Sequence, residues 1–217
     1  MPLELFAHPF SSYSQKVLIA LHERGVDFAF RRVDEPEAGA RLERLWPLRK
    51  FPVLVDGART LIESSVIVEY LDLVRPGPRP LVPADPLAAL EVRFMDRFLD
   101  NYVMTPVQAQ VGDRLRPPDA RDAFGMDAAR AQLSLAYGWL DDRMKGRRWT
   151  AGDEFTLADC TAAPALFYAD WVQPIPAEYA RARKLREDLL ARASVARTID
   201  DARPYRHLFP GGAPDRD

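Results

Sequence analysis

The sequence is poor in the residues that build disulfides and metal sites. It has one cysteine, Cys160, and three histidines among 217 residues. One cysteine cannot form an intrachain disulfide, and sparse cysteine is typical of a reducing compartment, so we expect a cytoplasmic location. No cysteine and histidine spacing matches a ligand set, so no metal is expected. A disulfide-stapled secreted domain and a zinc domain are both disfavoured.

Long apolar runs and an excess of one charge are also missing. No segment reaches about 18 consecutive apolar residues, which argues against a transmembrane helix and a membrane partner. The first residues lack the basic and apolar stretches of a signal peptide, so none is expected. The net charge is only −2, which gives no reason to expect a nucleic-acid partner. What is present is 47% hydrophobic residues, enough to build a core.

The first part of the chain, residues 1–77, mixes strand and helix signals. A helical crossover separates the first two strands, which predicts that they pair in parallel. Asp56-Gly57 predicts a hairpin between the last two strands. The expected strands cover residues 3–7, 28–33, 52–55 and 60–62, and the expected helices cover 15–24, 38–45 and 63–74. The resulting order is β-α-β-α-β-β-α.

The second part of the chain is helical in its periodicity. Residues 78–86 are rich in proline and are predicted to form a linker, because proline is excluded from helix interiors. Residues 87–210 show apolar side chains at steps of three and four, with a bend expected at Pro106. Residues 211–217 are predicted to be a disordered tail. The sequence thus indicates an α/β domain followed by an all-α domain.

A cluster of hydroxyl side chains separates the first strand from the first helix. Ser11, Ser12, Tyr13 and Ser14 occupy this position. Backbone N–H groups at a helix start have no intrahelical partner and carry the positive end of the helix dipole. The hydroxyls can therefore cap the helix, for which Ser14 is the expected residue, or hold an anion or thiolate.

Two further segments have both a structural and a functional interpretation. In KFPVLVDG, Pro52 opens an apolar strand. It is either an ordinary trans proline or a cis proline that leaves Val53 free to pair with an extended peptide ligand. In ESSVIVEYL, Ser64 is either a plain helix cap or part of a carboxylate site with Glu63 beside it to meet an ammonium group.

Together these segments resemble the cytosolic glutathione S-transferase family, in its serine-type, zeta- or theta-like form. The resemblance rests on SSYSQKV, KFP and ESS, and covers nearly the whole chain. It implies a thioredoxin-like N-terminal domain that binds glutathione and a helical-bundle C-terminal domain. The segment FTLADCTAA resembles the family's capping box, with Thr156 as N-cap and Asp159 at N3. Asp159 is then structural, and Cys160 is expected to be buried and inert.

The resemblance implies a role for each residue of the glutathione site. Pro52 would be cis, and Val53 would exchange main-chain hydrogen bonds with the cysteinyl part of glutathione. Glu63 and Ser64 would hold the γ-glutamyl amine and carboxylate. Lys50 would reach the glycyl carboxylate.

The same resemblance implies a serine that stabilises the glutathione thiolate by hydrogen bonding. Alignment from the helix places this role on Ser11, because SSYSQKV resembles the zeta-like SSCSWRV. Alignment from the strand places it on Ser12, and we favour Ser11. Tyr13 stands where zeta isomerases carry cysteine, which weakens an isomerase assignment.

The second substrate is expected to bind between the domains. The leading hypothesis is a cytosolic homodimeric transferase that conjugates glutathione to a small hydrophobic electrophile, as in detoxification. The alternatives are a glutathione-dependent isomerase or dehalogenase, and a binding protein without catalysis. Candidate walls of the electrophile site are the apolar side chains Phe10, Tyr13, Tyr102, Met104, Phe167 and Trp171.

Overall fold

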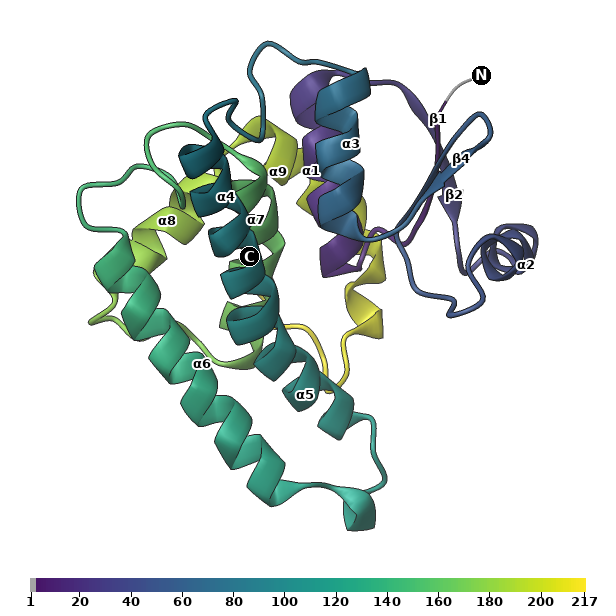
Figure 1. Ribbon diagram of the computed structural model, residues 1–217. Coiled ribbons are helices and arrows are strands. Elements are labelled where there is room, and N and C mark those ends of the chain that lie inside the picture. The colour runs from purple at the N-terminus through teal and green to yellow at the C-terminus, as the bar shows by residue number, and fades with distance from the viewer. Residues whose placement is uncertain (1–2) are drawn as a thin grey trace.

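The computed structural model describes residues 3–217 and begins with a mixed four-stranded sheet (Figure 1). Its strand order is β2-β1-β3-β4. The first two strands are parallel, as predicted, and the other pairs are antiparallel. The strands are β1 (Leu3–Ala7), β2 (Phe28–Arg32), β3 (Val53–Asp56) and β4 (Arg59–Leu61).

Three helices cover the two faces of this sheet. Helices α1 (Ser12–Arg24) and α3 (Ser64–Val74) lie on the face toward the C-terminal helices, and α2 (Pro36–Leu45) lies on the other (Figure 1). Successive side chains of β1 point to opposite faces of the sheet, so this strand contributes to the packing on both faces. Leu5 belongs to the main core, whereas Phe6 belongs to the smaller core beneath α2.

The remainder of the chain is helical, as the periodicity predicted. Helix α7 is almost entirely buried and packs against α1 of the first domain as well as α4. The helices are α4 (Pro86–Phe98), α5 (Thr105–Arg114), α6 (Ala123–Arg143), α7 (Leu157–Val172), α8 (Ala180–Leu190) and α9 (Ala193–Ala202), with the short helical segments η1 (Leu99–Met104), η2 (Pro118–Ala120) and η3 (Arg203–Leu208). A thioredoxin-like domain followed by a helical domain is therefore confirmed.

The start of α1 differs from the prediction. Ser11, not Ser14, is the N-cap, and its hydroxyl accepts a hydrogen bond from the Ser14 amide at 3.3 Å. Ser14 is already in the first turn and is fully buried, where its hydroxyl accepts from the His8 amide. The prediction of Ser14 as the cap was wrong, because an N-cap oxygen pairs with the amide of N2 or N3 and therefore stands before the turn.

Pro106 alters the helix that precedes it. A π-helical turn, η1, separates α4 from α5, and Pro106 occupies the first turn of α5. Proline lacks an N–H and its ring clashes with the carbonyl four residues earlier. The wider π-helical turn interrupts the regular α-helix just before Pro106, where the sequence predicted a bend. Helix α5 ends at Arg114, shortly before Pro117 and Pro118, which cannot continue a helix.

The capping box at the start of α7 is confirmed. The Thr156 amide donates to Asp159 Oδ2 at 2.9 Å, and the Thr150 amide donates to Oδ1 at 2.8 Å. Cys160 follows immediately and is fully buried, and burial raises the pKa of its thiol well above the usual value. Asp159 therefore holds a turn and a helix start together.

The C-terminal segment, residues 211–217, has no helix or strand and is mostly exposed, and its disorder stays a prediction. Asp217 forms ion pairs with Arg203 and Arg206, and Arg216 lies 3.2 Å from Asp170. Across residues 3–217, no helix is both long and apolar enough to cross a membrane.

Candidate functional site

A cavity of about 510 Å³ opens between the two domains beside the start of α1. It brings together four of the residues predicted to bind glutathione, namely Lys50, Pro52, Glu63 and Ser64. Ser11 and Tyr13 line the same cavity. Its C-terminal side is formed by Arg97, Asp100, Asn101, Thr105 and Gln108, and its remaining lining residues are Trp46, Arg49, Phe51 and Ile62.

The start of strand β3 lies beside this cavity. The Phe51–Pro52 peptide bond is cis, as the resemblance implied. Val53 pairs with Phe6 on β1, and pairing with β4 begins at Leu54. Pro52 lines the cavity, whereas Val53 is fully buried and does not, so main-chain pairing of Val53 with glutathione stays a prediction.

The start of α3 forms the next wall of the cavity. Ser64 is the first residue of α3 and is buried, and Glu63 precedes it with φ of 67°. Positive φ is uncommon for glutamate and is retained mainly where the surroundings enforce it, often at functional sites. Across residues 3–217, the Glu63 carboxylate forms no ion pair. The free amides at the start of α3 and the Ser64 hydroxyl can donate hydrogen bonds to a ligand carboxylate. The Glu63 carboxylate beside them can pair with an ammonium group of the same ligand.

A second, more apolar cavity of about 290 Å³ adjoins the first. Ser11, Tyr13 and Gln108 line both cavities, so these side chains stand where the two meet. The other lining residues of the apolar cavity are Phe10, Ser12, Met104, Val107, Val111, Tyr168, Leu208, Phe209 and Pro210. The arrangement places a polar compartment and an apolar compartment on either side of two hydroxyl groups.

The serines of the cluster occupy different positions relative to these compartments. Ser11 lines both cavities, whereas Ser12 lines only the apolar one and Ser14 lines neither. The Ser11 oxygen accepts from the Ser14 amide, which leaves its own O–H available as a donor. Ser11 can therefore cap the helix and donate a hydrogen bond into the site at the same time.

Tyr13 is a second hydroxyl at the junction. Burial, and secondly the nearby Asp100 carboxylate, raise the pKa of Tyr13 to about 12. The phenol therefore stays protonated at neutral pH and can act as a hydrogen-bond donor. Its position between the cavities makes it a competitor of Ser11 for contact with a bound thiolate.

Only half of the predicted electrophile walls lie in the apolar cavity. Phe10, Tyr13 and Met104 line it, but Tyr102, Phe167 and Trp171 do not. Phe167 and Trp171 are buried core residues whose rings lie 4.6 Å apart. Tyr102 is 52% exposed and packs on Phe98. Core side chains and pocket walls follow the same helical spacing, so spacing alone does not separate the two.

Several walls of the apolar cavity were missed by sequence reasoning. Val107 and Val111 stand three and seven residues after Met104, the spacing of one helix face. That spacing was a usable signal. Tyr168 and Phe209 had no such signal, because they reach the cavity from α7 and the C-terminal segment. The Tyr168 hydroxyl donates to the Phe10 carbonyl at 3.0 Å, which ties α7 to the start of the site.

A buried charge cluster beneath the cavity was also missed. Lys16 of α1 is 1% exposed, and its Nζ donates to Ser65 Oγ at 2.8 Å and to Asp100 Oδ2 at 3.3 Å. It forms a closer ion pair with Asp96 of α4. Thr161 of α7 donates to Asp96 Oδ1 at 2.6 Å. The cluster thus joins α1 and α3 of the first domain to α4, η1 and α7 of the second.

The two aspartates of this cluster respond differently to their surroundings. Burial alone would raise the pKa of Asp96, but the adjacent Lys16 ammonium lowers it overall. Burial raises the pKa of Asp100, and Lys16 offsets this only in part. Arg97 approaches Asp100 at 2.6 Å from the cavity side. Asp96 is therefore the principal counter-charge of Lys16.

The comparisons with known proteins agree with this geometry. Residues 5–79 match the family model described as glutathione S-transferase, N-terminal domain, and residues 123–192 match glutathione S-transferase, C-terminal domain. A curated relative, the stringent starvation protein A homolog of Coxiella burnetii (strain RSA 493 / Nine Mile phase I), is 33% identical over 166 residues, covering 76% of this chain and 75% of the relative. A probable maleylacetoacetate isomerase of Caenorhabditis elegans is 26% identical over 85% of this chain and 87% of its own.

The fold also matches solved structures. A glutathione S-transferase from Methylobacillus flagellatus KT, solved with glutathione bound, superimposes with a TM-score of 0.81 at 26% identity. The match covers 90% of this chain and 98% of that chain. The zeta- or theta-like subtype stays a prediction. The chain belongs to the glutathione S-transferase family of enzymes.

Proposed function

We propose that this protein transfers the thiolate of glutathione to a small hydrophobic electrophile. The observation that carries the proposal is the junction of two cavities at Ser11 and Tyr13. A sulfur atom placed at this junction lies between a polar compartment for the tripeptide and an apolar compartment for the second substrate. The serine-type assignment of Ser11 belongs to this proposal.

The polar compartment offers a complementary group for each part of glutathione. The α3 N-terminus with Ser64 accepts the γ-glutamyl carboxylate, and Glu63 accepts the ammonium group. The cis Phe51–Pro52 bond at the cavity wall supports pairing of the cysteinyl residue with the main chain at the start of β3, as the resemblance implied for Val53. Lys50 also lines the cavity and pairs with the glycyl carboxylate. This order directs the cysteinyl sulfur toward Ser11.

The proposed chemistry depends on ionisation of the sulfur. A free thiol has a pKa of about 8.5, so the reactive thiolate is a minority at neutral pH. The O–H of Ser11 donates a hydrogen bond to the anion, and the positive end of α1 favours it further. The thiol proton leaves to solvent, and the sulfur lone pair forms the C–S bond. In a substitution the leaving group departs with its bonding electrons.

The proposal extends to oligomeric state and location. Leu73 of α3 and the side chains of Leu87, Leu90 and Phe94 of α4 are exposed despite being apolar. Exposed apolar side chains on neighbouring helices suit a protein interface, so we propose a homodimer formed through α3 and α4. A cytoplasmic location and a role in detoxification are part of the same proposal.

Replacement of Ser64 by alanine is expected to weaken glutathione binding about 10-fold or more, because a hydrogen bond to a charged group contributes about 1.5–3 kcal/mol. Isothermal titration calorimetry measures the effect. Ser134→Ala is the matched control, because Ser134 is a half-buried serine of α6 that lines neither cavity, and this variant is expected to bind like the unsubstituted protein. Absence of binding by the unsubstituted protein at millimolar glutathione would overturn the proposed function.

A further inference from the structure

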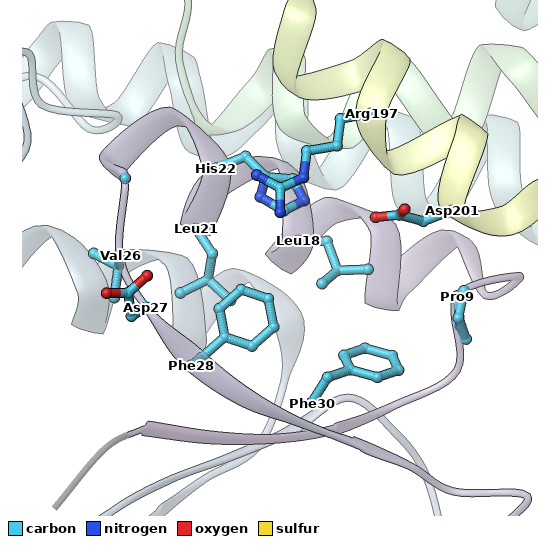
Figure 2. A pocket seen from close by; sticks show the side chains of 11 residues that line it. Pro9, Leu18, Leu21, His22, Val26, Asp27, Phe28, Phe30, Arg197 and Asp201 are labelled. Carbon is cyan, nitrogen blue, oxygen red and sulfur yellow. The ribbon is translucent and has the colours of Figure 1, made fainter.

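A third cavity, of about 490 Å³, lies between β2, α1 and α9 (Figure 2). It has no lining residue in common with the two cavities of the proposed active site. Its volume is within the range of about 300–1,000 Å³ found for small-molecule sites. Nothing in the proposed transferase chemistry uses it.

One side of this third cavity is apolar. Phe28 and Phe30 are two residues apart on β2, so their side chains share one face of the sheet. Strand β2 is an edge strand, and its face is only partly covered by Leu18 and Leu21 of α1. Both phenylalanine side chains are partly exposed, and their rings meet edge to face with centroids 6.5 Å apart, so they form an apolar wall of the cavity.

The opposite side carries charges of both signs. Arg197 and Asp201 extend from α9 over the cavity, four residues apart on one helix face, and Phe28 lies across from them (Figure 2). Both charged side chains are exposed. Within residues 3–217 neither of them forms an ion pair, although pairs at this spacing form elsewhere, as in Lys184 and Asp188.

A buried polar atom lies between the charged side and the apolar side. His22 lines the cavity, and its Nε2 is buried without a hydrogen-bond partner among the described residues. Burial, and secondly the positive charge of Arg197, lower the pKa of His22. The ring is therefore neutral at pH 7, and either tautomer offers a polar ligand atom one hydrogen bond at Nε2. A buried polar atom left without a partner costs about 1–3 kcal/mol, which a ligand would relieve.

We propose that this cavity binds a free α-amino acid with an aromatic side chain. The carboxylate of the ligand pairs with Arg197, its ammonium group pairs with Asp201, and its ring packs on Phe28 and Phe30. The charge pattern selects against simpler ligands. An apolar anion would meet the carboxylates of Asp201 and Asp27, and an apolar cation would meet Arg197. A zwitterion satisfies both charges.

The first test compares three ligands of similar shape on the full-length protein by isothermal titration calorimetry. L-phenylalanine is expected to bind saturably, with an affinity unchanged by saturating glutathione. Phenylpropionate lacks the ammonium group and phenylethylamine lacks the carboxylate, and each is expected to bind at least about 10-fold more weakly, or about 1.4 kcal/mol. Absence of saturable binding at millimolar L-phenylalanine, or equal binding of either analogue, would overturn the proposal.

The second test locates the site. Arg197→Gln and Asp201→Asn are each expected to weaken L-phenylalanine binding at least about 10-fold. Arg44→Gln is the matched control, because Arg44 is also exposed but lies on α2, outside the cavity. Conjugation activity and thermal midpoint should be the same in all three variants. Unchanged L-phenylalanine affinity in both cavity variants contradicts the assignment.

Discussion

Replacement of Ser11 by alanine is expected to lower kcat/KM for conjugation about 10²- to 10³-fold. This is the loss typical of removing one hydrogen-bond donor from an anion that an enzyme stabilises, which here is the glutathione thiolate. Ser11 is the serine that lines both cavities and has a donor O–H left after capping α1. Without that donor, less of the bound glutathione is thiolate at neutral pH. The dissociation constant for glutathione should change little, because the γ-glutamyl and glycyl groups are held elsewhere.

The pH dependence of the reaction separates thiolate stabilisation from a general loss of structure. In the unsubstituted protein the thiolate forms below the pH of about 8.5 at which a free thiol ionises. In Ser11→Ala the midpoint of the pH profile for kcat/KM is expected to move upward. The difference between the two proteins should therefore shrink at alkaline pH, where both carry thiolate.

Three control variants make the Ser11 prediction specific. Ser11→Gly removes the hydroxyl but costs only a few tenths of a kcal/mol as an N-cap, so it should lose activity and keep its stability. Ser12→Ala should retain most activity, because Ser12 lines only the apolar cavity. Tyr13→Phe tests the other hydroxyl at the junction. If Ser12→Ala or Tyr13→Phe alone abolishes conjugation, the assignment to Ser11 is wrong.

Replacement of Lys16 by methionine is expected to lower the free energy of unfolding by about 3–5 kcal/mol, the cost of breaking a buried ion pair from one side. Methionine fills similar volume but removes the buried cation from Asp96 and Asp100, so that the half-exposed Arg97 is the positive charge left beside these two buried carboxylates. For a chain of this size the loss corresponds to a fall in Tm of roughly 6–20 °C. Chemical denaturation and thermal unfolding measure it.

An exposed ion pair supplies the matched control for Lys16. Lys145 pairs with Asp142 on the surface, and Lys145→Met should change stability by no more than about 0.5 kcal/mol. Equal losses in both variants would show that the buried cluster has no special role in stability.

The effect of Lys16→Met should also depend on pH. The pKa of Asp96 is lower in the folded protein than in the unfolded chain. Ionised Asp96 therefore contributes to the free energy of unfolding at pH values above its unfolded pKa, and this contribution is lost as the pH falls through its folded pKa. A protonated carboxyl no longer needs Lys16. The stability gap between the variant and the unsubstituted protein should therefore narrow in acid. A gap that widens toward acid pH would contradict the role given to Asp96.

The features predicted well from the sequence depend on short stretches of main chain. Gly25 ends α1 in the left-handed conformation, with φ of 59°, as a C-cap glycine does. Gly57 and Ala58 form the turn between Asp56, at the end of β3, and Arg59, at the start of β4, and Thr156 and Asp159 form the capping box. Each of these requires contacts only between residues a few positions apart, and the residue types themselves indicate the geometry.

One error arose where neighbouring residues compete for one role. Ser11 and Ser14 are both able to cap a helix, and only the start of the turn decides that Ser11 does so. Phe167 and Trp171 are a separate case: they have the helical spacing of a pocket wall, but both side chains are buried, and their contact with an electrophile stays a prediction. A local pattern states which residues share a face and does not state what that face contacts.

By itself, the sequence determined the order of the elements, the two-domain fold and the residue types around a glutathione cradle, because propensity, capping and turn chemistry are local. Only the tertiary structure decided which hydroxyl stands at the junction of two cavities, which apolar side chains line the second one, and that Lys16 is buried against Asp96. These relations join residues far apart in the chain, as in the hydrogen bond between Tyr168 and Phe10, which are 158 positions apart. They depend on how α4, α5 and α7 pack against α1, and that packing is set by the whole core.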